Sequence, residues 1–180
     1  MGLTQSGVYR KLFRRQDLRV MMMGLENSGR MTIFNYLKVD SSVSIIPSAA
    51  FHESIEYRPY RMSIWTIGAY NHMKNFWHLY FDQAQGLIFI VDSSDESMIL
   101  ESKIELERLF GFPELEKTIL LVFANKQDQE NSKNTEEIAN ALGLNALNNR
   151  IWKIQGTSGI TGEGVFEGIN WICEQVENSI

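Results

Sequence analysis

Short apolar runs alternate along this chain with segments in which apolar residues recur at helical spacing. The runs predict buried strands at residues 20–23, 86–91, 118–124 and 151–154. The helical spacing predicts helices at residues 33–37, 72–81, 104–110, 135–142 and 165–176. Residues 54–57 and 60–65 flank Arg58-Pro59 as two strands joined by a tight turn. This alternation indicates an α/β domain with a mainly parallel sheet, helices on both faces, and ligands at the carboxyl ends of the strands.

Length and cysteine content narrow the class of protein. The 180 residues suit a single domain that is large enough for a real core. The single cysteine, Cys173, excludes a disulfide framework and a zinc cluster, and it favours a reducing, cytoplasmic setting. Cys173 lies among apolar residues of the last predicted helix, so we expect it to be buried. No apolar run reaches the length that spans a membrane, and no signal peptide is expected.

Charge is unevenly distributed along the chain. Residues 1–19 carry five basic residues and one acidic residue, a net charge of +4, and because the whole chain carries −5 the remainder carries −9. An acidic body with a short basic leader argues against nucleic acid as a partner. It favours an anionic surface that only the leader contacts.

The leader, residues 1–16, has two features of a membrane anchor. Residues 1–6 fit the N-myristoylation pattern M-G-x-x-x-[ST], which makes Gly2 the site of lipid attachment. Behind them an amphipathic helix is expected, with Val8, Tyr9, Leu12 and Phe13 on one face and basic residues on the other. One acyl chain binds membranes only marginally, so a basic helix is a fitting second signal. The alternative is a helix packed on the domain of residues 17–180, with a chance glycine at position 2.

A glycine-rich segment joins the first predicted strand to the first predicted helix. Gly24 and Gly29 have the spacing of the phosphate-binding pattern G-x-x-x-x-G-K-[ST], with Arg30 and Met31 in place of the lysine and the hydroxyl residue. Such a loop binds an anion through backbone N–H groups and the positive end of the helix, which depend little on side chains. The expected nucleotide-binding residues of this segment are Gly24, Leu25, Glu26, Asn27, Ser28, Gly29, Arg30, Met31 and Thr32.

A second motif, Asn125-Lys126-Gln127-Asp128, directly follows a predicted buried strand. The Asp128 carboxylate is suited to accept hydrogen bonds from the ring N–H and the exocyclic amine of guanine, a donor pair that adenine lacks. Asn125 would brace the loop, and the stem of Lys126 would cover the face of the base. A plain polar turn after a strand is the alternative, but the combination with the upstream loop favours guanine-nucleotide binding.

These motifs and others resemble the ADP-ribosylation factor (Arf/Arl) family of small GTPases along the whole chain. The matching stretches are the glycine-2 leader, residues 24–29, Ile46-Pro47-Ser48-x-x-Phe51, Trp65-x-Ile67-Gly68, Val91-Asp92-Ser93-Ser94-Asp95, and residues 120–128, 141–144 and 162–171. The resemblance implies a six-stranded P-loop GTPase fold, GTP and GDP as ligands, and two nucleotide-dependent switches. It also implies a myristoylated helix that is released to membranes in the GTP state.

The sequence departs from the family pattern at the magnesium positions. Arg30 keeps the charge of the family lysine, but its guanidinium is longer and forked. Met31 occupies the slot of the hydroxyl ligand, and a thioether is a poor ligand for a hard cation. Thr66 replaces the aspartate that orients the magnesium waters, whereas Ser48 still offers a hydroxyl in the first switch. These replacements argue against the binding of Mg²⁺ at this site.

The positions for hydrolysis depart further. Tyr70 occupies the slot of the glutamine that positions the attacking water, and Ala69 replaces the glycine whose N–H contacts the terminal phosphate. Ser158 and Gly159 match the base-contacting loop loosely, and a backbone N–H there is expected to meet the guanine oxygen. We therefore expect very slow or absent GTP hydrolysis.

Three functions remain open from the sequence. The first is an Arf-like switch, a cytoplasmic monomer that associates reversibly with Golgi or other endomembranes in vesicle-mediated protein transport. It would bind effector and regulator proteins at its switch surface. The second is a non-catalytic interaction module that binds guanine nucleotide structurally or not at all. The third, a nucleotide kinase, has little support, because the guanine-selecting motif argues against it.

Overall fold

The structure is a computed structural model, and it describes residues 17–38, 51–57, 60–66 and 81–179. Several predictions from the sequence lie outside the described residues. These are the leader with Gly2, the switch residues Ser48, Ala69 and Tyr70, and the predicted helix 72–81 except Phe81.

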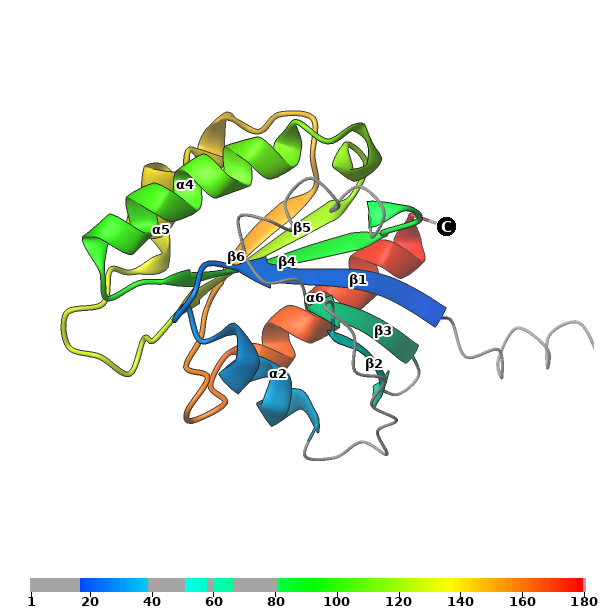
Figure 1. Ribbon diagram of the computed structural model, residues 1–180, viewed down its shortest axis with the longest axis horizontal. Coiled ribbons are helices and arrows are strands. Elements are labelled where there is room, and N and C mark those ends of the chain that lie inside the picture. The colour runs from blue at the N-terminus through cyan, green and yellow to red at the C-terminus, as the bar shows by residue number, and fades with distance from the viewer. Residues whose placement is uncertain (1–16, 39–50, 58–59, 67–80, 180) are drawn as a thin grey trace, which may run out of the picture.

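The described strands form one six-stranded sheet in the order β2-β3-β1-β4-β5-β6 (Figure 1). β1 runs parallel to both β3 and β4, and β5 continues the parallel arrangement to β6, whereas β2 pairs antiparallel with β3. The prediction of a mainly parallel six-stranded sheet is confirmed, with five parallel strands and one antiparallel edge strand. The strands are β1 Asp17–Gly24, β2 Phe51–Tyr57, β3 Tyr60–Thr66, β4 Gly86–Asp92, β5 Ile119–Asn125 and β6 Trp152–Gly156.

Four α-helices are described, and they cover both faces of the sheet. α4 and α5 lie on one face, and α2 and α6 lie on the other (Figure 1). Two short 3-10 helices, Pro113–Leu115 and Leu144–Ala146, connect helices to strands. The α-helices are α2 Arg30–Lys38, α4 Glu96–Phe110, α5 Thr135–Leu142 and α6 Val165–Asn178.

The core follows from the two-residue repeat of the central strands. In β1, Val20 and Met22 pack on the α2 and α6 side, while Met21 and Met23 pack on the α4 and α5 side. All seven residues of β4 are buried, as are all seven of β5, which explains why both strands read as continuous apolar runs. Cys173 is fully buried in α6, as expected from its apolar neighbours.

α4 is longer than the sequence pattern predicted, because its first two turns were not recognised. Asp95 caps the helix, and its side chain accepts hydrogen bonds from the backbone N–H groups of Ser97 and Met98. The solvent face of these turns carries Leu100, and with Ile104 it blurs the apolar stripe that identifies a helix. The aspartate cap was the signal that would have found the true start.

Candidate functional site

The loops that follow β1, β4, β5 and β6 lie close together, at the carboxyl ends of these parallel strands. In the strand register Gly24 of β1 lies beside Ile90 of β4, and Asp92 of β4 lies beside Asn125 of β5. Ala124 of β5 lies beside Gly156 of β6. The phosphate-loop segment, the guanine-motif segment and the segment after β6 therefore emerge at one edge of the sheet, although they are far apart in sequence (Figure 1).

The segment between β1 and α2 is a tight loop that requires glycine at both ends. A Cβ atom on Gly24 would lie 2.5 Å from the carbonyl oxygen of Ile90. Gly29 has a φ of +86°, and a Cβ there would lie 2.2 Å from Nδ2 of Asn125. α2 begins directly afterwards, so the positive end of its dipole is directed at the loop.

Ser28 lies inside the curve of this loop and is 2 % exposed. Among the described residues its hydroxyl has no hydrogen-bond partner, and it would lie 2.9 Å from a Cβ on Gly24. A buried hydroxyl without a partner is costly, and the oxygen of a bound anion would satisfy it.

Asn125 joins the loops of the site. Its Nδ2 donates to the carbonyl oxygen of Ser28 at 2.8 Å, and its Oδ1 accepts from the backbone N–H of Gly159 at 2.9 Å. The hydroxyl of Thr157 also donates to Oδ1, at 3.3 Å. Because Asn125 is 2 % exposed, these bonds are shielded from water. The guanine motif, the phosphate loop and the segment after β6 are thereby held together.

Lys126 and Asp128 of the same motif differ in their surroundings. Lys126 adopts a left-handed φ of +68°, and its Nζ makes an ion pair with Oδ2 of Asp92. Asp128 is exposed and lies in the turn that follows β5. The backbone N–H of Gln127 donates to the carbonyl oxygen of Thr157 at 3.0 Å, which keeps the motif beside the segment after β6.

Asp92 is a residue of this site that the sequence motifs did not predict. Burial of this carboxyl would raise its pKa, but the hydrogen bonds from Lys126 and Ser94 outweigh burial and lower the pKa below its ordinary value. A signal was present, because Asp92 is a charged residue at the end of an otherwise apolar strand. Thr157 was also missed, and it directly precedes the predicted site residue Ser158.

The segment of Ser158 and Gly159 was expected to offer a backbone N–H to a guanine oxygen. In the structure the N–H of Ser158 donates to the carbonyl oxygen of Glu163 at 3.1 Å. The N–H of Gly159 donates to Asn125, as described above. Both groups are therefore engaged within the chain.

The first turn of α2 carries the residues that depart from the phosphate-loop pattern. Nη1 of Arg30 donates to the carbonyl oxygen of Gly24 at 2.7 Å, so the guanidinium folds back over the start of the loop. Met31 is 38 % exposed, and Thr32 is also exposed. Thr66 ends β3 and lies in register beside Met22 of β1, which places its backbone in the sheet next to β1.

A central parallel sheet that carries this loop and this base motif at its carboxyl edge defines a small GTPase. The model of the ADP-ribosylation factor family matches residues 5–176. The chain belongs to that family of small GTPases, whose ligands are GTP and GDP.

Solved structures agree with this assignment. One of them is the Arl6 (BBS3) small GTPase from Trypanosoma brucei with a bound nucleotide analogue, GppNp. It is 27 % identical to this chain and superposes with a TM-score of 0.82, over 91 % of this chain and 99 % of the other. In the part of the chain that the structure describes, no helix has the length and apolar character needed to cross a membrane.

Magnesium, the usual companion of the phosphates in small GTPases, does not fit the donor at position 31. Met31 presents a thioether, which is a poor ligand for a hard cation. Within the described ranges, no group of three or more histidine, cysteine or acidic side chains is arranged to hold a metal ion.

Proposed function

We propose that this chain is a guanine-nucleotide-dependent switch that associates with membranes, acts in vesicle-mediated protein transport, and hydrolyses GTP very slowly or not at all. The observation that carries the proposal is Asn125, which is hydrogen bonded to Ser28 in the phosphate loop and to Gly159 after β6. This linkage supports a single site in which Asp128 would select guanine and the phosphate loop would hold the phosphates. The bound GppNp in the Arl6 structure supports nucleotide binding at such a site.

Nucleotide binding is tested by calorimetric titration of the purified protein with GDP, GTPγS and ATP, with Mg²⁺ and with EDTA, after removal of any co-purified nucleotide. We expect binding of GDP and GTPγS and no binding of ATP. Asp128→Ala should abolish this selectivity, because guanine then loses its carboxylate partner. Absence of guanine-nucleotide binding by the wild-type protein would overturn the proposal.

Slow hydrolysis follows from the residues at the family's catalytic slots. Tyr70 offers no amide to position a water, Met31 offers no oxygen ligand for a metal, and Thr66 offers no carboxylate to orient the waters of a metal. A triple variant with Tyr70→Gln, Met31→Thr and Thr66→Asp should hydrolyse GTP faster than the wild type in single-turnover assays. Equal rates in the two proteins would contradict this part of the proposal.

A non-catalytic interaction module is the second candidate function. The exposed thioether of Met31 and the guanidinium of Arg30, which is bonded to Gly24, favour it. Such a module would bind GDP and GTPγS equally well and with no response to Mg²⁺, or it would bind neither nucleotide. Guanine-nucleotide binding that Mg²⁺ strengthens would favour the switch instead.

Membrane association is a separate part of the proposal, and it rests on the leader of residues 1–16 ahead of the nucleotide-binding domain of residues 17–180. We expect the myristoylated protein to partition onto anionic vesicles and Gly2→Ala to abolish most of this binding. Gly7→Ala is the matched control, because it leaves the acylation pattern intact. Unchanged partitioning of Gly2→Ala would refute lipid attachment.

A further inference from the structure

A lysine of the guanine motif is held across two strand ends by a buried carboxylate. Asp92 ends β4 in register with Asn125 of β5, and Lys126 reaches back from β5 so that its Nζ contacts Oδ2 of Asp92. The Asp92 side chain is 8 % exposed, whereas the Lys126 side chain is 27 % exposed. The ion pair is therefore mostly buried, at the carboxyl ends of β4 and β5, where the loops of the site meet.

The carboxylate is itself fixed in place. Its Oδ1 accepts a hydrogen bond from the backbone N–H of Ser94 at 2.9 Å and another from the Ser94 hydroxyl at 2.6 Å. With one oxygen held by Ser94 and the other by Lys126, the orientation of the Asp92 carboxylate is determined on both sides.

The backbone of Lys126 is equally constrained. A left-handed φ of +68° is unfavourable for a lysine, and it persists only where the surroundings impose it. Here the carbonyl oxygen of Lys126 accepts from the N–H of Gln129 at 3.0 Å, and the next residue, Gln127, is bonded to Thr157. Because both its backbone and its ammonium are held, the Lys126 side chain has few accessible rotamers, and this restricts the position of its aliphatic stem.

We propose that Asp92 is a positioning residue for guanine: by holding the ammonium of Lys126, it keeps the lysine stem extended as an apolar wall against which the base stacks. This inference rests on the proposed function, because it takes the base to lie at the motif of residues 125–128. A lysine without Asp92 would sample many rotamers, and GDP binding would have to order it.

The test is a double-mutant cycle on GDP affinity, measured by calorimetry with wild type, Asp92→Ala, Lys126→Ala and the double variant. We expect each single variant to bind GDP about tenfold more weakly, and the double variant to bind no more weakly than Lys126→Ala. A merely structural carboxylate would give additive losses. Asp92→Asn, which keeps an acceptor for Ser94, loses some stability but should still unfold cooperatively well above the assay temperature, so that its weaker GDP binding is measured on folded protein.

The ion pair between Lys133 and Glu96 is the matched control. Its Nζ and Oε1 atoms are 3.0 Å apart on the exposed surface nearby, and Glu96→Ala should leave GDP affinity unchanged. Additive losses, or Asp92 variants that bind GDP as tightly as the wild type or more tightly, would overturn the inference while leaving the proposed function intact. Absence of GDP binding by the wild type would overturn both.

Discussion

Nδ2 of Asn125 lies 2.8 Å from the carbonyl oxygen of Ser28, although 97 positions separate the two residues in the chain. The opposite end of the same side chain accepts from Gly159. One buried amide therefore connects three loops, and the stability of the domain is coupled to the geometry of the candidate nucleotide site.

Replacing Asn125 should destabilise the domain strongly. Asn125→Ala leaves the Ser28 carbonyl and the Gly159 N–H buried without their partner, so we expect the free energy of unfolding to fall by about 2–4 kcal/mol. Urea denaturation measures this loss. Asn131→Ala is the control, because its amide bonds the carbonyl of Ser94 on the exposed surface and its loss should cost less than about 1 kcal/mol. Equal losses would show that burial of the Asn125 bonds does not matter.

Two glycines with similar backbone angles should respond differently to alanine. Gly143 has a φ of +74° with nothing within 4 Å of an added Cβ, so Gly143→Ala should cost only the left-handed strain, about 1–2 kcal/mol. Gly29→Ala adds a collision with Asn125 to the same strain and should cost about 3–5 kcal/mol. It should also weaken GDP binding, which Gly143→Ala should leave unchanged. Urea denaturation and calorimetry test both statements, and equal costs would contradict them.

The ion pair of Asp92 should make the free energy of unfolding depend on pH in the acid range. Because the pKa of Asp92 is lower in the folded chain than its ordinary value of 3.8, the unfolded chain binds the proton more readily. Its contribution is present above that value and is lost as the pH falls through the folded pKa. The stability advantage of the wild type over Asp92→Asn should therefore shrink below about pH 4. Midpoints of urea denaturation from pH 7 to pH 2.5 measure this difference between the wild type and Asp92→Asn. A difference that stays constant with pH would argue against the ion pair.

The single thiol should be inert in the folded protein. Burial, with smaller contributions from Glu174 and Glu177, raises the pKa of Cys173 to about 12. The thiol is therefore protonated at pH 8, and a disulfide reagent should label the native protein far more slowly than the protein in guanidinium chloride. Since the folded state keeps this proton while the unfolded state loses it, the contribution of Cys173 to stability should fall as the pH rises from about 9 towards 12. Rapid labelling of the native chain would contradict burial.

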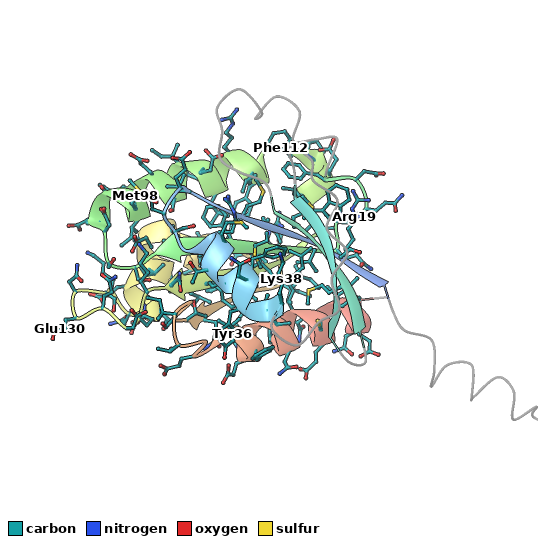
Figure 2. The ribbon with its side chains drawn as sticks, turned by 60° about the horizontal axis from the view of Figure 1, so that its bottom comes forward. Arg19, Tyr36, Lys38, Met98, Phe112 and Glu130 are labelled. Carbon is teal, nitrogen blue, oxygen red and sulfur yellow. The ribbon has the colours of Figure 1, made fainter. Side chains whose placement is uncertain are left out.

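Exposed side chains outside the candidate site are suitable for control substitutions. Figure 2 shows Met98 on α4 and Glu130 on the segment between β5 and α5, whereas Tyr36 and Lys38 lie on α2. Glu130 is exposed in the segment after the guanine motif, so a substitution there serves to separate effects of the motif from effects of general charge.

Much of this architecture was predictable because it depends on local or periodic features. The apolar runs located β4 and β5 to within one residue, since a strand buried on both faces has no polar alternation. The capping box of Asn134 and Glu137 starts α5, and the left-handed Gly143 ends it, where the pattern had placed that helix. The glycine spacing and the motif of residues 125–128 likewise located the loops of the site.

Only the tertiary structure decided how these loops act on one another. The pairing of Asp92 with Lys126 requires β4 and β5 to lie in a register that sets Asp92 beside Asn125. The bond from Arg30 to Gly24 depends on the path of the loop, which spacing alone leaves open. The sequence determined which residues reach the carboxyl edge of the sheet, because strand ends and motifs are local. Which of them contact each other is a matter of distances across strands, and those distances exist only once the sheet has formed.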